Sequence, residues 1–591
     1  MNHFKIKKKA SYLLDLGNFI ISEFPFIIIF FCCIVPTTLK DSLANGISIS
    51  DLKYFSIAFL YSVIFAYIGS KKQYLKILFY SIGITLFGVY MFLWLVFGTS
   101  ISPLIIQLIA ETNMRETSEF FSAFAFNKGA IITYVSIVLL IILVLFLEKN
   151  WDKIKIKKWL RNSYSAVTLG IFSILFLLGG LFNLRIYYTL YKCQFMDELE
   201  QWVTKNEPFP MDSFTALAYS TYAPHATMNE IKKAIDFAEK IYKQPLTDSV
   251  NDSINVIYIL GESFIKSHAS LYGYRLKTTP FMDLEREKGN LVPFNDVVAP
   301  FNSTTLVEKN TFCCNSLANK EEWYKTPFFP VLFKKAGYKV SLWDIQKDFD
   351  NNAFFTFSVN SFIYNKDLQK YAYSYTSGKE FQYDGEMVDD FFKSKASKLA
   401  RKNLIMFHLL GQHIGASDRF PHIKQFCKFS YKDINRNESY MTQEKKQDIA
   451  DYDNATLYND YVIRKIVEPY MNKTTIMVYF SDHGEEIYDY RDSKGRNAGG
   501  SVTPNLLKYQ YEVPFVIWFS DSFIKKYPRL VNDIKTSKNK PFVTDNVCQV
   551  LFHLTGLKTN WYKPNRDLIS PMYVHRKRII AGVDYDKYVK K

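Results

Sequence analysis

The chain has 591 residues, which is too long for one ordinary hydrophobic core, so two or more domains are expected. Aromatic residues make up 17% of the sequence, a content that excludes a low-complexity or disordered protein. The formal net charge of +16 would suit a nucleic-acid partner, but no basic patch coincides with a nucleic-acid-binding motif, so no such partner is expected.

The first 185 residues are strongly apolar and contain five stretches that approach the roughly 20 residues needed to cross a bilayer. Glu23 and Pro25 interrupt the first stretch near its start. A basic N-terminus before an apolar run is also typical of a signal peptide, but the four later stretches favour an uncleaved first helix. The predicted spans are residues 17–37, 52–69, 75–98, 130–147 and 165–184.

Basic residues gather in the loops on one side of these spans. The N-terminus and loops 70–76 and 149–161 contain 13 Lys and Arg residues, whereas the two opposite loops contain three. The positive-inside rule therefore places the N-terminus in the cytoplasm, and five spans place everything after residue 185 beyond the cytoplasmic membrane. Residues 186–250 look helical and amphipathic, and either lie along the membrane surface or connect to the next domain as a packed helix.

From residue 251 onward the pattern is that of an α/β domain. Four continuous apolar runs have the character of strands buried on both faces, and helical segments, two of them closing on Gly, lie between them. This alternation predicts a mostly parallel sheet between helices, in which ligands bind beyond the carboxyl ends of the strands. The predicted strands are residues 254–260, 403–410, 474–480 and 513–519.

Three of these strands are followed by residues of the types that bind metals. Glu262 follows the first strand, His413 follows the second, and Asp482 and His483 follow the third. Carboxylate and imidazole groups are common ligands of divalent cations. Any one of the three is also explained by a strand that ends in solvent, but together they indicate one shared metal site at this edge of the sheet.

Ser303, Thr304 and Thr305 stand directly before a predicted helix and are candidate nucleophiles. A hydroxyl bound to a divalent cation loses much of its proton affinity and can attack phosphorus. The N-terminus of a helix also favours a phosphoryl anion. The alternative is that these residues cap the helix, because Ser and Thr are preferred capping residues.

Taken together, these features resemble the phosphoethanolamine transferases that modify lipopolysaccharide. The resemblance covers nearly the whole chain. It implies a five-helix transmembrane bundle (1–185), linker helices at the membrane surface (186–250) and a periplasmic domain of the alkaline-phosphatase/sulfatase fold (251–591), in the bacterial inner membrane. The motifs that carry it are GES (261–263), SLYGYRLKTTPFMDLE (270–285), NSTTL (302–306), HLLGQH (408–413), SDHGEE (481–486) and TDNVCQVLFHLTGL (544–557).

The resemblance also implies roles for individual residues. Zinc would be bound by Glu262, Thr305, Asp482 and His483. Thr305 would also be the nucleophile, chosen over Thr304 because the family's threonine opens the helix just after two small residues. His413 would contact the phosphoryl group or hold a second zinc ion, and would supply or accept a proton.

Two further segments bear on substrate binding. Thr112 and Glu116, within LIAETNMRETSEFF, match the family's loop that touches the lipid headgroup, although Leu108 replaces its usual Asn. Asn497 stands near the place of a second histidine of the family. An Asn side chain can hydrogen-bond a phosphoryl oxygen but cannot act as a general acid, so one zinc ion rather than two is expected. The scarcity of cysteines also indicates a divergent member.

The activity implied is zinc-dependent transfer of phosphoethanolamine from phosphatidylethanolamine to lipid A or the core sugars of lipopolysaccharide. A phosphothreonine intermediate would form and diacylglycerol would be released. The modification would reduce the negative charge of the cell surface and so weaken capture of cationic peptides such as polymyxin.

Two alternatives use the same scaffold: a phosphoglycerol transferase of the lipoteichoic-acid-synthase kind, and an inactive membrane-anchored binding protein. A sulfatase is disfavoured because the Cys/Ser-x-Pro-x-Arg motif is missing. A transporter is disfavoured because Glu23 is nearly the only charge within the spans.

Overall fold

The computed structural model divides the chain into two compact units, one running to Glu230 and the other beginning at Ile231. The division of the chain into three segments at residues 185 and 250 stays a prediction. The structure describes residues 2–103, 105–106, 109, 117–118, 120, 124–154, 162–203, 211–244, 253–346, 361–496 and 502–589.

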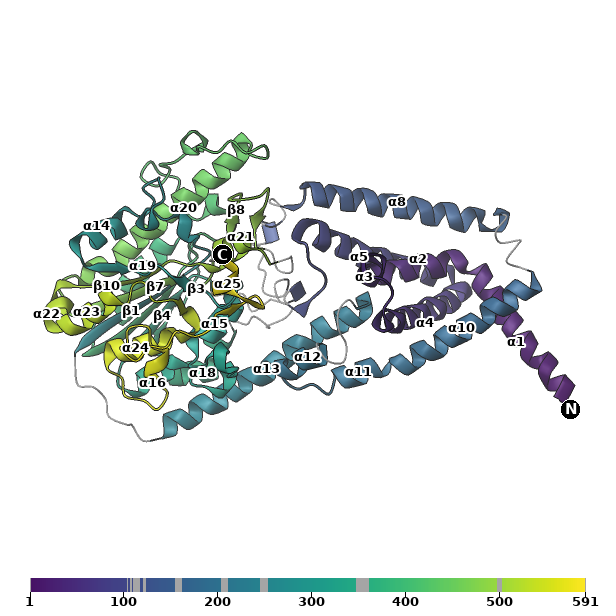
Figure 1. Cartoon of the computed structure of the whole chain (residues 1–591), viewed down its shortest axis with the longest axis horizontal. Coiled ribbons are helices and arrows are strands. Elements are labelled where there is room, and N and C mark those ends of the chain that lie inside the picture. The colour runs from purple at the N-terminus through teal and green to yellow at the C-terminus, as the bar shows by residue number, and fades with distance from the viewer. Residues whose placement is uncertain are drawn as a thin grey trace. The chain divides into compact units, whose positions relative to one another are not determined.

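The N-terminal unit is built from apolar helices (Figure 1). Among the described residues, four helices are long and apolar enough to cross a membrane, or five if one bent pair counts as a single span. The predicted spans 52–69 and 130–147 lie within single helices, spans 75–98 and 165–184 end one residue beyond a helix, and span 17–37 runs across the first three helices. The helices are α1 (Asn2–Ser22), α2 (Phe24–Ile34), α3 (Pro36–Asn45), α4 (Ile49–Lys71), α5 (Gln73–Phe97), α8 (Lys128–Asn150), α10 (Ser163–Asn183), α11 (Arg185–Leu190) and α12 (Met196–Gln201).

The bent pair is α1 and α2, which meet at 72° around Glu23. Pro25 lies in the first turn of α2, where its missing N–H group costs no helical hydrogen bond, but a proline there cannot continue α1. Glu23 forms an ion pair with Lys76 at 3.0 Å. The two residues that interrupt the apolar run in the sequence therefore mark a real break in the helix.

Helix α13 (Ser213–Lys243) follows, and the second unit then forms around a seven-stranded sheet with the order β2-β10-β7-β1-β6-β4-β5. The pairs β7–β1, β1–β6, β6–β4 and β4–β5 are parallel, whereas β10 runs antiparallel to both of its neighbours. The prediction of a mostly parallel sheet is confirmed. The strands are β1 (Ile254–Gly261), β2 (Leu291–Pro293), β4 (Lys339–Asp344), β5 (Tyr375–Thr376), β6 (Lys402–His408), β7 (Thr475–Ser481) and β10 (Phe515–Phe519).

The register of the sheet brings the strand ends together. Gly261 at the end of β1 pairs with Ser481 at the end of β7, and Leu260 pairs with His408 at the end of β6. Asp344 at the end of β4 pairs with His408 from the other side. The segments that leave these four strands therefore start at one edge of the sheet.

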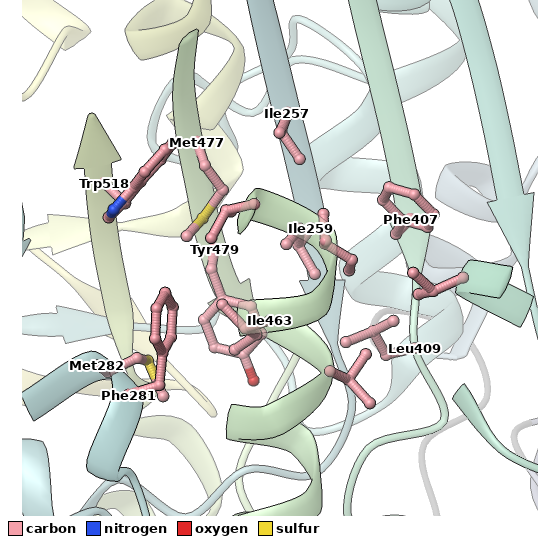
Figure 2. Packing of buried hydrophobic residues seen from close by; sticks show 14 of the residues in the cluster. Ile257, Ile259, Phe281, Met282, Phe407, Leu409, Ile463, Met477, Tyr479 and Trp518 are labelled. Carbon is pink, nitrogen blue, oxygen red and sulfur yellow. The ribbon is translucent and has the colours of Figure 1, made fainter. Parts of the chain in front are cut away.

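The two faces of the sheet are covered by different helices (Figure 1). On one face, Ile257, Ile259 and Met477 belong to a cluster that includes Ile463 of α20 (Gln443–Val467) (Figure 2). On the other face, the ring of Tyr258 packs against Phe312 of α15 (Thr304–Phe312). Burying each large apolar side chain contributes about 1.5–3 kcal/mol, so the sheet gives the edge a rigid support.

Two of the predicted helices close on Gly as expected. Gly289 follows α14 (Pro280–Lys288) and Gly556 follows α24 (Val547–Thr555), with φ of 81° and 61°, a conformation that only Gly adopts without cost. The remaining elements are α16 (Phe329–Lys335), α17 (Ser361–Tyr364), α18 (Lys366–Ala372), α19 (Asp384–Lys393), α21 (Pro504–Tyr511), α22 (Asp521–Lys526), α23 (Pro528–Thr536), α25 (Tyr585–Val589), β3 (Val297–Val298), β8 (Glu486–Ile487), β9 (Lys494–Gly495), β11 (Phe542–Val543), β12 (Ile579–Ile580) and β13 (Val583–Asp584).

Candidate metal centre and nucleophile

Three buried side chains that leave β1 and β7 converge in a group that fits a metal ion. One ligand atom from each of Glu262, Asp482 and His483 lies within 4.8 Å of the others. The Nε2 atom of His483 is 3.4 Å from Oε1 of Glu262 and 3.0 Å from Oδ2 of Asp482. Two carboxylates and an imidazole at this spacing form a common donor set for zinc.

Asp482 shows most directly that the group suits a cation. Its Oδ1 atom accepts hydrogen bonds from the N–H groups of Ser263 and His483, at 3.1 and 2.7 Å. Its Oδ2 atom is buried and accepts no hydrogen bond from the part of the chain that the structure describes. Burial raises the pKa of Asp482, and a bound cation would offset that burial. The residues present therefore fit a divalent metal.

His483 is held in the tautomer that binds metals. Its Nδ1 atom donates to the carbonyl of Gly484 at 2.8 Å, which leaves the lone pair of Nε2 facing the site. Burial, with the charge of Arg496, lowers the pKa of His483 to about 3, so the ring is neutral. The Cβ of any residue replacing Gly484 would lie 2.0 Å from the carbonyl oxygen of Tyr509, so only Gly fits beside this histidine.

The turn after β1 is strained in a way that aims Glu262 into the site. Ser263 has a φ of 55°, a left-handed conformation that costs a residue other than Gly on the order of 1 kcal/mol. In this conformation its N–H group faces Asp482 and its hydroxyl donates to Oε1 of Glu262 at 2.6 Å. The hydrogen bonds of Ser263 therefore link the segment after β1 to Asp482, which follows β7.

The hydroxyl that lies among the metal-binding candidates is that of Thr304, the first residue of α15. Its Oγ1 atom donates to Oε2 of Glu262 at 3.0 Å and is 3.2 Å from Nε2 of His483. The family resemblance implies Thr305 instead, and the side chain of Thr305 lies outside the described part of the structure. Ser303 occupies the N-cap position in an extended conformation, so the helix opens at Thr304.

His413 lies at the same edge, where burial lowers its pKa to about 3 and Glu262, Arg419, Arg496 and His483 act on it electrostatically. The ring is therefore neutral. Its Nδ1 atom is buried without a hydrogen-bond partner among the described residues. The structure thus brings four of the predicted site residues together, namely Glu262, His413, Asp482 and His483. Thr112, Glu116 and Asn497 lie outside the described residues.

A second polar group, which was not predicted from the sequence, lies next to Glu262. Nδ1 of His408 is 2.8 Å from Oδ2 of Asp344 and 3.4 Å from Oε1 of Glu308. The amide nitrogen of Gln346 is 3.1 Å from Nε2 of His408 and 3.3 Å from Oε2 of Glu262. The group therefore supports Glu262. No local sequence pattern reveals this group, because it forms only where the ends of β4 and β6 pair.

A third buried group fixes the segment that carries Asp482 and His483. The ring of His268 lies between two carboxylates, with Nδ1 2.7 Å from Asp453 and Nε2 3.0 Å from Asp489. Burial disfavours its charge, but the two carboxylates outweigh burial and raise the pKa of His268 to about 10. The charged ring therefore ties Asp489, six residues after His483, to α20.

The Sulfatase family model matches residues 254–557, about half of the chain. The protein therefore belongs to the sulfatase family.

Comparison with individual proteins gives a more specific similarity than the family model does. Phosphoethanolamine transferase EptC of Escherichia coli (strain K12) is 26% identical over 514 residues, 83% of each chain. The crystal structure of the C-terminal periplasmic domain of E. coli EptC has a TM-score of 0.50 and 26% identity, over 58% of this chain and 95% of that one. The integral membrane EptA of Neisseria meningitidis is 15% identical with a TM-score of 0.52, over 94% and 98% of the two chains, and supports the fold alone.

Proposed function

We propose that this protein transfers phosphoethanolamine from phosphatidylethanolamine to lipid A or the core sugars of lipopolysaccharide. The catalytic domain would face the periplasm from the bacterial inner membrane. One observation carries the proposal: the hydroxyl of Thr304 lies within hydrogen-bonding distance of two of the three metal-binding candidates, at the N-terminus of α15. The similarity to phosphoethanolamine transferases over 83% of the chain supports the choice of group transferred.

Glu262, Asp482 and His483, with the oxygen of Thr304, would hold a single zinc ion. When bound, zinc would lower the pKa of the threonine hydroxyl and neutralise charge on the non-bridging phosphoryl oxygens. The neutral ring of His483 already presents Nε2 for binding. Thr304 replaces the predicted Thr305 as ligand and nucleophile in this proposal.

The reaction would proceed in two displacements. In the first, Glu262 takes the proton of the Thr304 hydroxyl, to which it is already hydrogen-bonded. The threonine oxygen then forms a bond to phosphorus as the bond to the glycerol oxygen breaks, and the proton held by Glu262 passes to the glycerol oxygen, so that diacylglycerol leaves. In the second, an acceptor oxygen gives its proton to Glu262 and forms a bond to the same phosphorus as the bond to the oxygen of Thr304 breaks, and that proton then passes to Thr304.

We assign His413, whose ring is neutral, to the relay of these protons between Glu262 and the leaving and attacking oxygens. Its buried Nδ1 atom has no partner among the described residues, so it retains a capacity to hydrogen-bond a substrate. Thr112, Glu116 and Asn497 remain predicted contacts of the substrate.

The test uses the full-length protein in detergent with zinc and either phosphatidylethanolamine or phosphatidylglycerol. Digestion after Lys288 and Lys309 isolates one peptide that contains both Thr304 and Thr305. Fragmentation of this peptide should place a phosphoethanolamine group on Thr304 in the natural protein and in Thr305→Ala, the matched control. Thr304→Ala should carry no adduct and release no diacylglycerol.

Other outcomes would point elsewhere. An adduct on Thr305 that is lost in Thr305→Ala would restore the nucleophile predicted from the sequence. A phosphoglycerol adduct would favour the lipoteichoic-acid-synthase kind of activity. The absence of both adducts and of released diacylglycerol would favour a binding protein.

A further inference from the structure

Arg496, next to β9, directs its guanidinium group into the metal-binding candidates. Its Nη1 atom donates to Nε2 of His483 at 2.5 Å and to the carbonyl oxygen of Asn302 at 3.3 Å. Its Nε atom is 3.8 Å from Oε2 of Glu485. The side chain is 23% exposed, so the cation is partly screened from water but open to a ligand from outside.

We propose that Arg496 binds the phosphoryl group that Thr304 receives, as a fixed cation beside the metal. This inference rests on the proposed function, because it concerns the oxygens of the same transferred group. It adds to the predicted contact of Asn497 with the phosphoryl group.

Charge balance is the first argument. The carboxylates of Glu262 and Asp482 carry two negative charges, which a divalent metal would neutralise. A phosphoryl diester or phosphothreonine then adds further negative charge. The N-terminus of α15 contributes about half an elementary charge, which is less than the phosphoryl group carries. The guanidinium group of Arg496 supplies a full charge at the same place.

Geometry is the second argument. The lone pair of His483 to which Arg496 donates is the one a metal would use. A metal there requires Arg496 to turn its Nη1 atom to another acceptor. Oγ1 of Thr304 is 3.2 Å from the same Nε2 atom. Phosphoryl oxygens bound to Thr304 would therefore lie close to the guanidinium group of Arg496. The fork of a guanidinium group matches two such oxygens.

Arg491 shows what a structural arginine in this segment looks like. Its Nε and Nη2 atoms lie 2.7 and 2.8 Å from the two carboxylate oxygens of Glu486, a complete bidentate pair. Glu485, the carboxylate that faces Arg496, lies beyond hydrogen-bonding distance of its Nε atom. The described hydrogen bonds of Arg496 go to two neutral acceptors, the carbonyl of Asn302 and Nε2 of His483. An oxyanion would be a stronger acceptor than either of them.

The experiment measures the binding of inorganic phosphate to the zinc-loaded full-length protein in detergent by titration calorimetry. Zinc content is determined in parallel by mass spectrometry. Arg496→Ala should weaken phosphate binding by roughly ten- to a hundred-fold, the loss of a charge-assisted hydrogen bond, with the zinc content unchanged. Arg496→Lys should lose less, because it keeps the charge but not the fork.

Lys494→Ala is the matched control. Lys494 lies on β9 two residues away, but its Nζ atom pairs with Asp448 at 2.9 Å. Its loss should leave phosphate binding unchanged. Two results would overturn the inference: phosphate binding by Arg496→Ala at the natural affinity, or loss of zinc from Arg496→Ala, which would make Arg496 a support for the metal instead.

The readout does not depend on turnover, so it separates this inference from the proposed function. Phosphate binding that requires Arg496, without a threonine adduct from phosphatidylethanolamine, would support Arg496 and reject the donor. A Thr304 adduct together with phosphate binding that does not depend on Arg496 would support the donor and reject the role of Arg496.

Discussion

Replacement of His268 by Ala should destabilise the catalytic domain in a way that depends on pH. The ring is buried between Asp453 and Asp489, and Tyr274 donates a further hydrogen bond to Asp453 at 2.8 Å. Removing it leaves two buried carboxylates without their positive partner. Breaking a buried ion pair in this way costs about 3–5 kcal/mol.

The raised pKa of His268 gives a contribution to stability of the same size and shows in which direction this contribution changes with pH. The pKa is raised from 6.5 to about 10 in the folded protein. At about 1.4 kcal/mol per pKa unit, this shift corresponds to roughly 5 kcal/mol of stability. Because the pKa is raised, the contribution is complete below pH 6.5 and is lost as the pH rises through about 10.

The assay is urea denaturation of the full-length protein at pH 6 and pH 10, followed by tryptophan fluorescence, with chelator present throughout so that metal binding makes no contribution. The penalty of His268→Ala should be about 4–5 kcal/mol at pH 6 and should largely disappear at pH 10. His422→Ala, at an exposed histidine, should change stability by less than about 0.5 kcal/mol. An equal penalty for His268→Ala at both pH values would refute the charge-based argument.

Three other predictions concern the core and the metal site. Ile259→Ala removes a fully buried side chain of the sheet and should lower the free energy of unfolding in urea by about 2–5 kcal/mol, whereas the exposed Ile423→Ala should change it little. Gln346→Ala removes the amide between Glu262 and His408 and should weaken zinc binding about ten- to a hundred-fold in chelator competition; unchanged affinity would mean that the bridge is incidental. Chelation should lower the melting temperature, and zinc at about 100 times its dissociation constant should restore about 2.7 kcal/mol; a melting temperature insensitive to zinc would contradict a metal centre here.

Local sequence patterns predict much of the architecture. The apolar helices of the N-terminal unit follow from continuous apolar stretches of membrane length, because a bilayer tolerates few charges within a helix. The strands around Ile259 and Met477 are recognisable because both faces of the sheet are buried. Glu262, Asp482 and His483 could be predicted as one site because parallel strands deliver their carboxyl ends to the same edge.

The choice of hydroxyl could not be made from the sequence. Adjacent helical residues point about 100° apart, so the first residue of α15 decides which side chain faces Glu262. The pattern NSTTL permits a start at either threonine, and the folded chain places the hydroxyl of Thr304 against Glu262. A shift of one residue, ordinary for a predicted helix boundary, therefore changes which threonine is proposed as the nucleophile.

The supporting contacts were also decided by tertiary structure. His268 meets Asp489 across 221 residues of sequence, and Gln346 meets Glu262 across 84. Such pairs leave no periodic pattern, because each depends on the register of strands and on the paths of loops between them. Arg496 is the clearest case, because it was not among the residues predicted for the site, yet the fold places its charge against His483. Local patterns determined the kind of site this protein has, and long-range packing decided which side chains complete it.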